Sequence, residues 1–128
     1  MTHIKAYLVE DSAVIAENLI ATLEELTSVR VVGHSGLEGE ARAWLTAVAS
    51  DWQLAIVDIF LREGSGLGVL TACKTRGAGR SLVVISNYAT PEMRRHCLAL
   101  GADAVFDKST EIDALVDYCR ALAHDDAV

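Results

Sequence analysis

Short runs of apolar residues alternate five times along this chain with segments whose apolar residues recur every three or four positions. The apolar runs do not alternate strictly with polar residues, which is typical of strands buried on both faces of a parallel sheet. The predicted strands are Ile4–Glu10, Val29–His34, Gln53–Asp58, Arg80–Ser86 and Asp103–Asp107. This pattern indicates a parallel sheet whose strands are connected by helices.

The segments between the strands have the spacing of amphipathic helices. In the first of them, apolar residues recur at helical spacing from Ile15 to Leu26. Thr90 is a suitable cap residue, Pro91 fits the first helical position, and Gly101 fits the end of the same helix. The predicted helices are Ser12–Leu26, a segment through Val48, Val69–Lys74, Thr90 to about Gly101, and a last helix from Thr110.

Three further local signals concern element boundaries. Ser35 to Glu38 matches a capping box, which predicts that the second helix begins there. The glycine cluster from Gly64 to Gly68 predicts a loop, and His124 to Val128 predicts a frayed tail.

A β-α pattern repeated five times predicts an α/β fold, with a doubly wound five-stranded parallel sheet covered by helices on both faces. The 128 residues are the length of one domain, so we expect residues 1–128 to form a single domain. Ligands of such sheets bind outside the carboxyl ends of the strands. Candidate functional residues are therefore sought at that edge.

Composition narrows the class of protein. Hydrophobic residues make up 52% of the chain, which argues against disorder. No apolar stretch approaches the roughly 18 to 20 residues of a membrane span, and the N-terminus lacks the pattern of a signal peptide. We therefore expect a cytoplasmic location and no membrane insertion.

The net charge of −7 argues against direct binding to nucleic acid, which requires a basic patch. The one basic cluster, Arg94-Arg95-His96, is interpreted as a solvated helix face. Cys73, Cys97 and Cys119 are far apart and are predicted to be buried apolar side chains. The four histidines are scattered and show no spacing of a zinc site.

Acidic residues follow two of the predicted strands. Glu10 and Asp11 end the first strand, and Asp58 ends the third. Mg²⁺ prefers oxygen ligands and keeps several waters, so Asp11 and Asp58 are predicted to bind it directly and Glu10 through water. A loop carbonyl near Phe60 would complete the ligand set.

A hydroxyl and an ammonium follow two other strands. Ser86 ends the fourth strand, and Lys108 comes directly after the fifth. Carboxylates serve as nucleophiles that form aspartyl-phosphates, and phosphoryl transfer depends mainly on positioning and charge stabilisation. Asp58 is therefore the predicted acceptor, with Mg²⁺, Lys108 and Ser86 each covering one phosphoryl oxygen.

Three other α/β functions fit the sequence poorly. The first strand is followed by Glu10-Asp11-Ser12 where a dinucleotide-binding fold needs a GxGxxG turn, and the chain has no GxxxxGK[ST] phosphate loop. A phosphatase with an aspartate nucleophile usually carries a second aspartate two residues later, and that position is Phe60. Multi-turnover hydrolysis is therefore not expected.

These motifs together resemble the receiver domain of two-component response regulators over nearly the whole chain. The resemblance rests on Leu8–Ser12, Val57-Asp58, Gly64–Leu67, Val84–Asn87, Gly101–Asp103 and Phe106–Ser109. It implies a flavodoxin-like sheet of order 2-1-3-4-5 and Mg²⁺-dependent acceptance of phosphate from a histidine kinase. It also implies signalling through the face formed by the fourth helix, the fifth strand and the fifth helix.

Several positions depart from the family pattern. Val105 stands where the family usually has an aromatic switch residue that acts with the Ser86 hydroxyl. Phe106 is next to it, but side chains alternate across a strand, so Phe106 should face the other way. Ser109 replaces the proline that usually follows the lysine.

Three residues are predicted to control access to the site. Asn87 replaces a small residue after the hydroxyl, which would narrow the pocket. Phe60 and Tyr88 occupy positions that, in this family, flank the approach of the hydrolytic water. We therefore expect a long-lived aspartyl-phosphate.

The resemblance leaves several roles open. The protein is either a phosphorylation-controlled switch that contacts a downstream target protein, with homodimer formation on phosphorylation as an option, or a relay that passes phosphate to a histidine phosphotransfer protein. A weaker third idea is a scaffold that acts unphosphorylated. No output domain is expected within 1–128, and the sequence fits either a free-standing receiver or a fragment of a larger regulator.

Overall fold

The computed structural model describes residues 3–126, and their five strands form one parallel sheet of order β2-β1-β3-β4-β5. This confirms the predicted fold class and strand order. The predicted strand boundaries agree to within one residue. The strands are β1 (Ile4–Val9), β2 (Val29–Ser35), β3 (Leu54–Asp58), β4 (Ser81–Ser86) and β5 (Ala104–Asp107).

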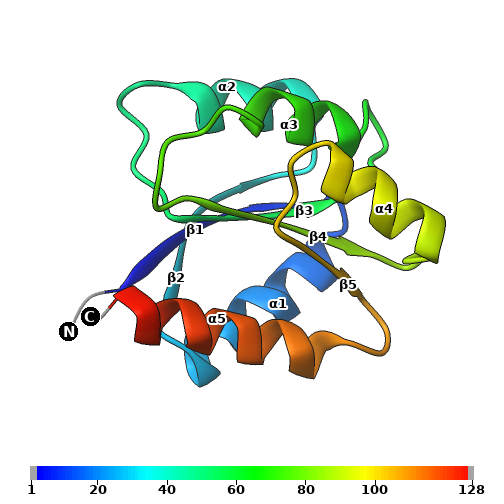
Figure 1. Cartoon of the computed structure of the whole chain (residues 1–128). Helices are drawn as coiled ribbons and strands as arrows, with labels where there is room; N and C mark the ends of the chain where they lie inside the picture. The colour runs from blue at the N-terminus through cyan, green and yellow to red at the C-terminus, as the bar shows by residue number, and fades with distance from the viewer. Residues whose placement is uncertain (1–2, 127–128) are drawn as a thin grey trace.

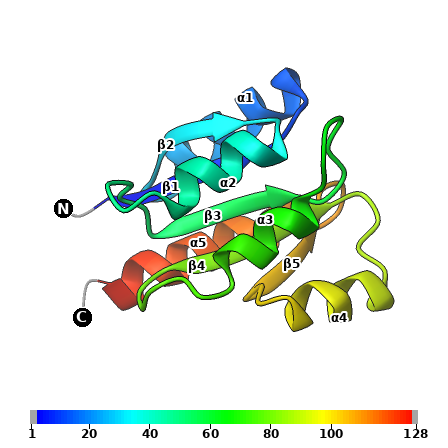
Figure 2. The same cartoon turned by 90° about the horizontal axis from the view of Figure 1, so that it is seen from above.

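Helices cover both faces of the sheet (Figure 1 and Figure 2). Helices α1 and α5 lie on one face, and α2, α3 and α4 lie on the other. The helices are α1 (Ala13–Leu26), α2 (Glu38–Thr46), α3 (Gly66–Cys73), α4 (Pro91–Ala99) and α5 (Ile112–Asp126). Among the described residues, no helix is both long and apolar enough to cross a membrane.

The sheet separates two apolar cores, and successive residues of a strand enter opposite ones. Ile56 packs with α1 and α5, whereas Val57 packs with the helices of the other face. The same alternation sends Val105 to the α4 side and Phe106 to the α5 side, where its ring meets Tyr118 edge-on at 5.7 Å. Burial on both faces explains why the strands read as continuous apolar runs.

Local side-chain bonds start three of the helices. Ser12, Ser65 and Thr90 each accept a hydrogen bond from a backbone N–H in the first turn of the helix that follows. Pro91 begins α4 as predicted, and Gly101 follows that helix with φ of 108°. The three cysteines are free and buried, also as predicted.

The predicted capping box is wrong. Ser35 is the last residue of β2, because it pairs with Val9 and its carbonyl accepts a hydrogen bond from the Glu10 N–H. Helix α2 therefore begins at Glu38, and its cap, Leu37, makes no side-chain bond to it. The Glu38 carboxylate accepts instead from the distant Ser65 N–H at 2.8 Å.

Other boundaries also differ from the sequence prediction, and α2 ends at Thr46 and not at Val48. Helix α3 begins at Gly66 and not at Val69, because Ser65 caps it and Gly66 packs directly against the Asp58 carbonyl. At the other end of the chain, α5 continues to Asp126, beyond the predicted start of the tail at His124. Residues 127–128 of the predicted tail lie outside the described residues.

Candidate phosphoacceptor and cation site

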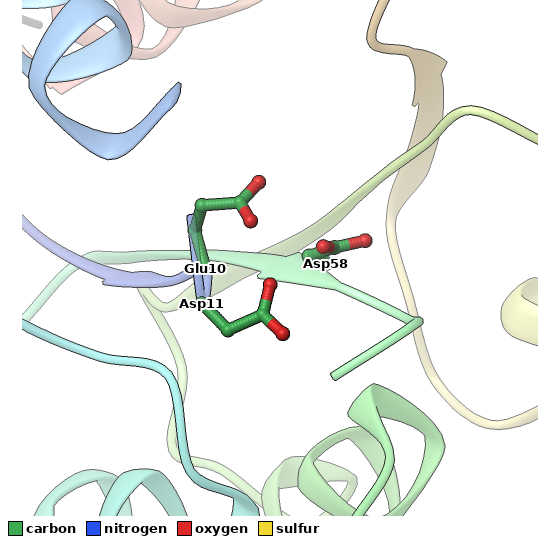
Figure 3. Close-up of side chains that lie close together, drawn as sticks. All are labelled: Glu10, Asp11 and Asp58. Carbon is green, nitrogen blue, oxygen red and sulfur yellow. The ribbon is translucent and has the colours of Figure 1, made fainter. Parts of the chain in front are cut away.

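The three predicted acids meet at the carboxyl edge of the sheet, where β1 and β3 end side by side. Glu10 and Asp11 follow β1, and Asp58 is the last residue of β3 (Figure 3). One carboxylate oxygen from each of the three lies within 4.8 Å of the others. The strand pairing Val9 to Val57 places these two strand ends in register, which is why the acids converge.

Two of these acids are buried. Glu10 is 4% exposed and Asp58 is 3% exposed, whereas Asp11 is partly exposed. Burial, and to a smaller extent the charge of Glu10, raise the pKa of Asp58 from 3.8 to about 6, although the Lys108 ammonium and the Phe60 N–H act in the opposite direction. The neutral form of Asp58 is therefore accessible near neutral pH.

Lys108 supplies the positive charge of this cluster. Its Nζ donates to Asp58 Oδ2 at 3.0 Å and lies 2.6 Å from Glu10 Oε1. Burial lowers the pKa of Lys108, but the bonds to Glu10 and Asp58 outweigh it and raise the pKa above its usual value. The ammonium thus contacts two of the three carboxylates. The third, Asp11, lies 4.0 Å from the exposed Arg62 guanidinium, so the site keeps an excess of negative charge.

Backbone N–H groups hold one oxygen of each carboxylate. Ser12 N donates to Glu10 at 3.1 Å, Arg62 N to Asp11 at 2.8 Å, and Phe60 N to Asp58 at 3.3 Å. Glu10 Oε1 is buried against the Lys108 ammonium, 2.6 Å away. Oriented carboxylates and an excess of negative charge fit a hard divalent cation such as Mg²⁺.

Ser86 lies at the same edge, as the last residue of β4. It is fully buried, and its hydroxyl oxygen accepts from the Tyr88 N–H at 3.0 Å. Its carbonyl accepts from the Lys108 N–H at 3.0 Å, which ties the end of β4 to the residue that carries the ammonium. The strand neighbour of Asp58 is Ile85, so Ser86 lies one residue farther along the edge.

The residues predicted to control access lie on the rim. Phe60 and Tyr88 are 52% and 65% exposed, and their rings meet edge-on with centroids 5.4 Å apart. Asn87 accepts a hydrogen bond from the Ser109 hydroxyl, which links the loops after β4 and β5. The aromatic pair thus bridges the loops that follow β3 and β4.

Arg94 makes contacts that the sequence did not reveal. The interpretation of this residue as part of a solvated helix face is wrong. Its guanidinium donates to the carbonyls of Ala89 and Val105 and to the Glu111 carboxylate. It therefore joins α4, the loop before it, β5 and the start of α5. The partners lie up to 17 residues away, so no local pattern marks them.

The sequence and the fold have clear relatives. Residues 6–120 match the model of one protein family, the response regulator receiver domain. A relative named as a probable transcriptional regulatory protein, from Picosynechococcus sp., is 31% identical over 94% of this chain and 49% of its own length.

Among solved structures, a CheY-like receiver domain protein from Methanospirillum hungatei is 25% identical, with a TM-score of 0.79 and 98% of each chain covered. A response regulator from Burkholderia pseudomallei, 19% identical with a TM-score of 0.75, covers 97% of this chain and 71% of its own, and contains a phosphorylated aspartic acid and a calcium ion. The chain spans about half the length of the curated relatives it matches. Its match to the family model and its fold show that the chain belongs to the response regulator receiver domain family.

Proposed function

We propose that this protein accepts a phosphoryl group on Asp58 from a histidine kinase or a histidine phosphotransfer protein. The observation that supports this best is the pairing of the buried Asp58 carboxylate with Lys108, within 4.8 Å of two other carboxylates. A structural ion pair would need one acid for one base. Here three carboxylates carry more negative charge than Lys108 and the exposed Arg62 neutralise, and a bound cation would offset the remainder.

In the transfer step, a carboxylate oxygen of Asp58 forms a bond to phosphorus as the phosphorus–nitrogen bond of the donor phosphohistidine breaks. The imidazole nitrogen keeps the electron pair of that bond. Lys108 is already hydrogen-bonded to Asp58 and can move its ammonium onto a phosphoryl oxygen. The Ser86 oxygen accepts from Tyr88, so its own proton can be donated to a second phosphoryl oxygen.

Mg²⁺, when bound, would supply positive charge for the remaining phosphoryl oxygen. Asp11 and Asp58 would hold it directly, Glu10 through water, and the Phe60 carbonyl would complete the protein ligands. The roles of these residues follow from the donor chemistry of the cluster. In the same scheme Phe60, Asn87 and Tyr88 restrict the approach of water, so the phosphorylated state outlasts the transfer and the protein acts as a signal and not as a multi-turnover enzyme.

The output would be a contact with a downstream protein through the face of α4, β5 and α5. Arg94 supports this route, because it connects that face to Ala89, three residues after Ser86. Val105, the non-aromatic residue at the switch position, is buried next to it. A homodimer of this face and a relay to a histidine phosphotransfer protein are the alternatives. For these 128 residues we propose no direct contact with nucleic acid, because the net charge is −7.

The test of the acceptor is intact-mass measurement after incubation with acetyl phosphate and Mg²⁺. The wild-type protein should gain one phosphoryl group, and Asp58→Asn should gain none. Asp103→Asn, at the opposite edge of the sheet, is the matched control and should be labelled like the wild type. Labelling that persists in Asp58→Asn would rule out this assignment.

The switch and the relay are separated by a second measurement. The phosphorylated protein is mixed with a histidine phosphotransfer domain, and the phosphate on each protein is followed with time. Rapid transfer to histidine favours the relay. Phosphate that stays on Asp58 while affinity for a target protein changes favours the switch.

A further inference from the structure

Glu38, in the first turn of α2, contacts the loop that follows Asp58 from a different layer of the molecule. Its Oε1 accepts from the Ser65 N–H at 2.8 Å, and its own N–H donates to the Glu63 carbonyl at 3.4 Å. Arg42, one turn later, donates to Oε2 at 3.1 Å and fixes the carboxylate from the other side. The Glu38 carboxylate is thus committed to the loop and to Arg42.

Two glycines leave the space that this carboxylate occupies. A Cβ atom at Gly64, whose φ is 84°, would lie 2.5 Å from Glu38 Cβ. A Cβ atom at Gly68 would overlap Glu38 Oε2. Gly68 lies inside helix α3, where glycine is the least favourable residue except proline. The absence of a side chain at position 68 is explained if that space must hold the Glu38 carboxylate.

The anchored residue is joined directly to the functional site. Ser65 forms an antiparallel bridge with Phe60, and Gly66 N donates to the Ile59 carbonyl at 2.9 Å. Phe60 N in turn donates to Asp58 Oδ1 at 3.3 Å. From Glu38 to Asp58 the contacts therefore run through Ser65 and Phe60 without a break.

We infer that Glu38 is a positioning residue, which holds the loop of residues 59–65 so that Asp58 and the Phe60 backbone are correctly placed for the cation. This inference rests on the function proposed above. The hydrogen bond from Ser65, and then Arg42, lower the pKa of Glu38, so its carboxylate is ionised at neutral pH. Glu38 itself does not touch the cation or the phosphoryl group.

The first part of the test compares Glu38→Ala, Glu38→Gln and the control Glu40→Ala, which removes the same charge from the exposed side of the same helix. Mg²⁺ affinity is measured by calorimetry and phosphorylation by acetyl phosphate. Glu38→Ala should weaken Mg²⁺ binding about tenfold, the effect usual for residues that orient metal ligands. Glu38→Gln keeps an oxygen that can accept from Ser65 N and should retain most of the affinity, and Glu40→Ala should retain all of it.

The second part uses Gly68→Ala in two backgrounds. In the wild-type background the new methyl group displaces the Glu38 carboxylate, so Mg²⁺ affinity should fall. In the Glu38→Ala background there is no carboxylate to displace, so Gly68→Ala should leave Mg²⁺ affinity unchanged and raise the melting temperature, because alanine favours the helix. Equal effects in both backgrounds would overturn the inference.

Amide hydrogen exchange separates this inference from the proposed function. Exchange in residues 59–66 should become faster in Glu38→Ala and not in Glu40→Ala. If the wild-type protein neither binds Mg²⁺ nor gains phosphate, the proposed function fails while exchange still reports the anchor. If Mg²⁺ binding is normal in the wild type and unchanged in Glu38→Ala, the anchor has no role in the site and the inference fails alone.

Discussion

The two edges of the sheet handle charge in opposite ways. At the amino edge, Lys5 pairs with Asp51 at 2.6 Å and Arg76 pairs with Asp103 at 2.8 Å. Arg80 donates to two backbone carbonyls and lies over the ring of Trp52. Each of these cations has its own partners, and both acids remain in contact with solvent.

At the carboxyl edge the charges do not balance. The buried Glu10 and Asp58 share the one ammonium of Lys108, and Asp11 has only the exposed Arg62 guanidinium, 4.0 Å away. Buried groups of this kind are costly unless a ligand compensates them, which is why they mark functional sites. In this fold, therefore, the number of ionic contacts does not identify the functional site, whereas an excess of buried negative charge does.

The largest expected effect comes from removing the cation at each edge. Lys108→Met should slow phosphorylation by acetyl phosphate roughly a hundred- to a thousandfold, because it removes a preorganised positive charge from the transferring group. Arg76→Met removes a cation from the amino edge and should change only stability. Rate constants measured well below both melting temperatures test this, and equal slowing in the two variants would erase the distinction between the edges.

The second-largest expected effect is that the contribution of an acid to folding stability changes with pH in opposite directions at the two edges. The pKa of Asp58 is raised to about 6, so between pH 4 and 6 the unfolded state loses its proton first and stability falls as pH rises. Well above pH 6 the free-energy cost of holding the ionised Asp58 carboxylate in the fold stays constant at roughly 3 kcal/mol. Asp58→Asn should therefore be more stable than the wild type at pH 7.5 without Mg²⁺, and the difference should disappear near pH 4.

The amino edge provides the opposite case. The hydrogen bond from Lys5 lowers the pKa of Asp51, so this carboxylate stabilises the fold above its ordinary pKa and the contribution is lost as pH falls. Asp51→Asn should be slightly less stable than the wild type at pH 7.5. Urea unfolding of both variants across this pH range is the measurement. If Asp58→Asn were less stable than the wild type at pH 7.5, the ionised Asp58 carboxylate would not destabilise the fold and this prediction would be wrong.

The smallest expected effect concerns the exposed rim of the carboxyl edge. If the paired rings of Phe60 and Tyr88 exclude the hydrolytic water, replacing both should speed loss of phosphate about tenfold, equivalent to about 1.4 kcal/mol of barrier. The decay of phosphorylated protein is compared for the wild type, Phe60→Asn, Tyr88→Glu and the double variant. Equal decay in all four would leave the pair as part of a binding surface.

Local sequence patterns were sufficient to predict much of this fold. The buried strands could be predicted because burial on both faces requires apolar residues along their whole length, and the helices because their apolar residues recur at helical spacing. The start of α4 was also predictable, since Thr90 and Pro91 act on the turn that directly follows them. Parallel pairing then brings all carboxyl ends to one edge, so the candidate residues Glu10, Asp11 and Asp58 could be named in advance.

Tertiary structure alone decided the features that depend on contacts between distant segments. Glu38 was mistaken for part of a capping box because its partner, Ser65, lies 27 residues later. Arg94 was mistaken for a solvated residue because its partners lie on β5 and directly before α5. The raised pKa of Asp58 likewise arises only once folding buries it beside Glu10. The sequence by itself therefore determined which residues reach the site, through rules that act over a few neighbouring residues. Only the tertiary structure decided how those residues are charged and held, because burial and long-range hydrogen bonds exist only in the folded chain.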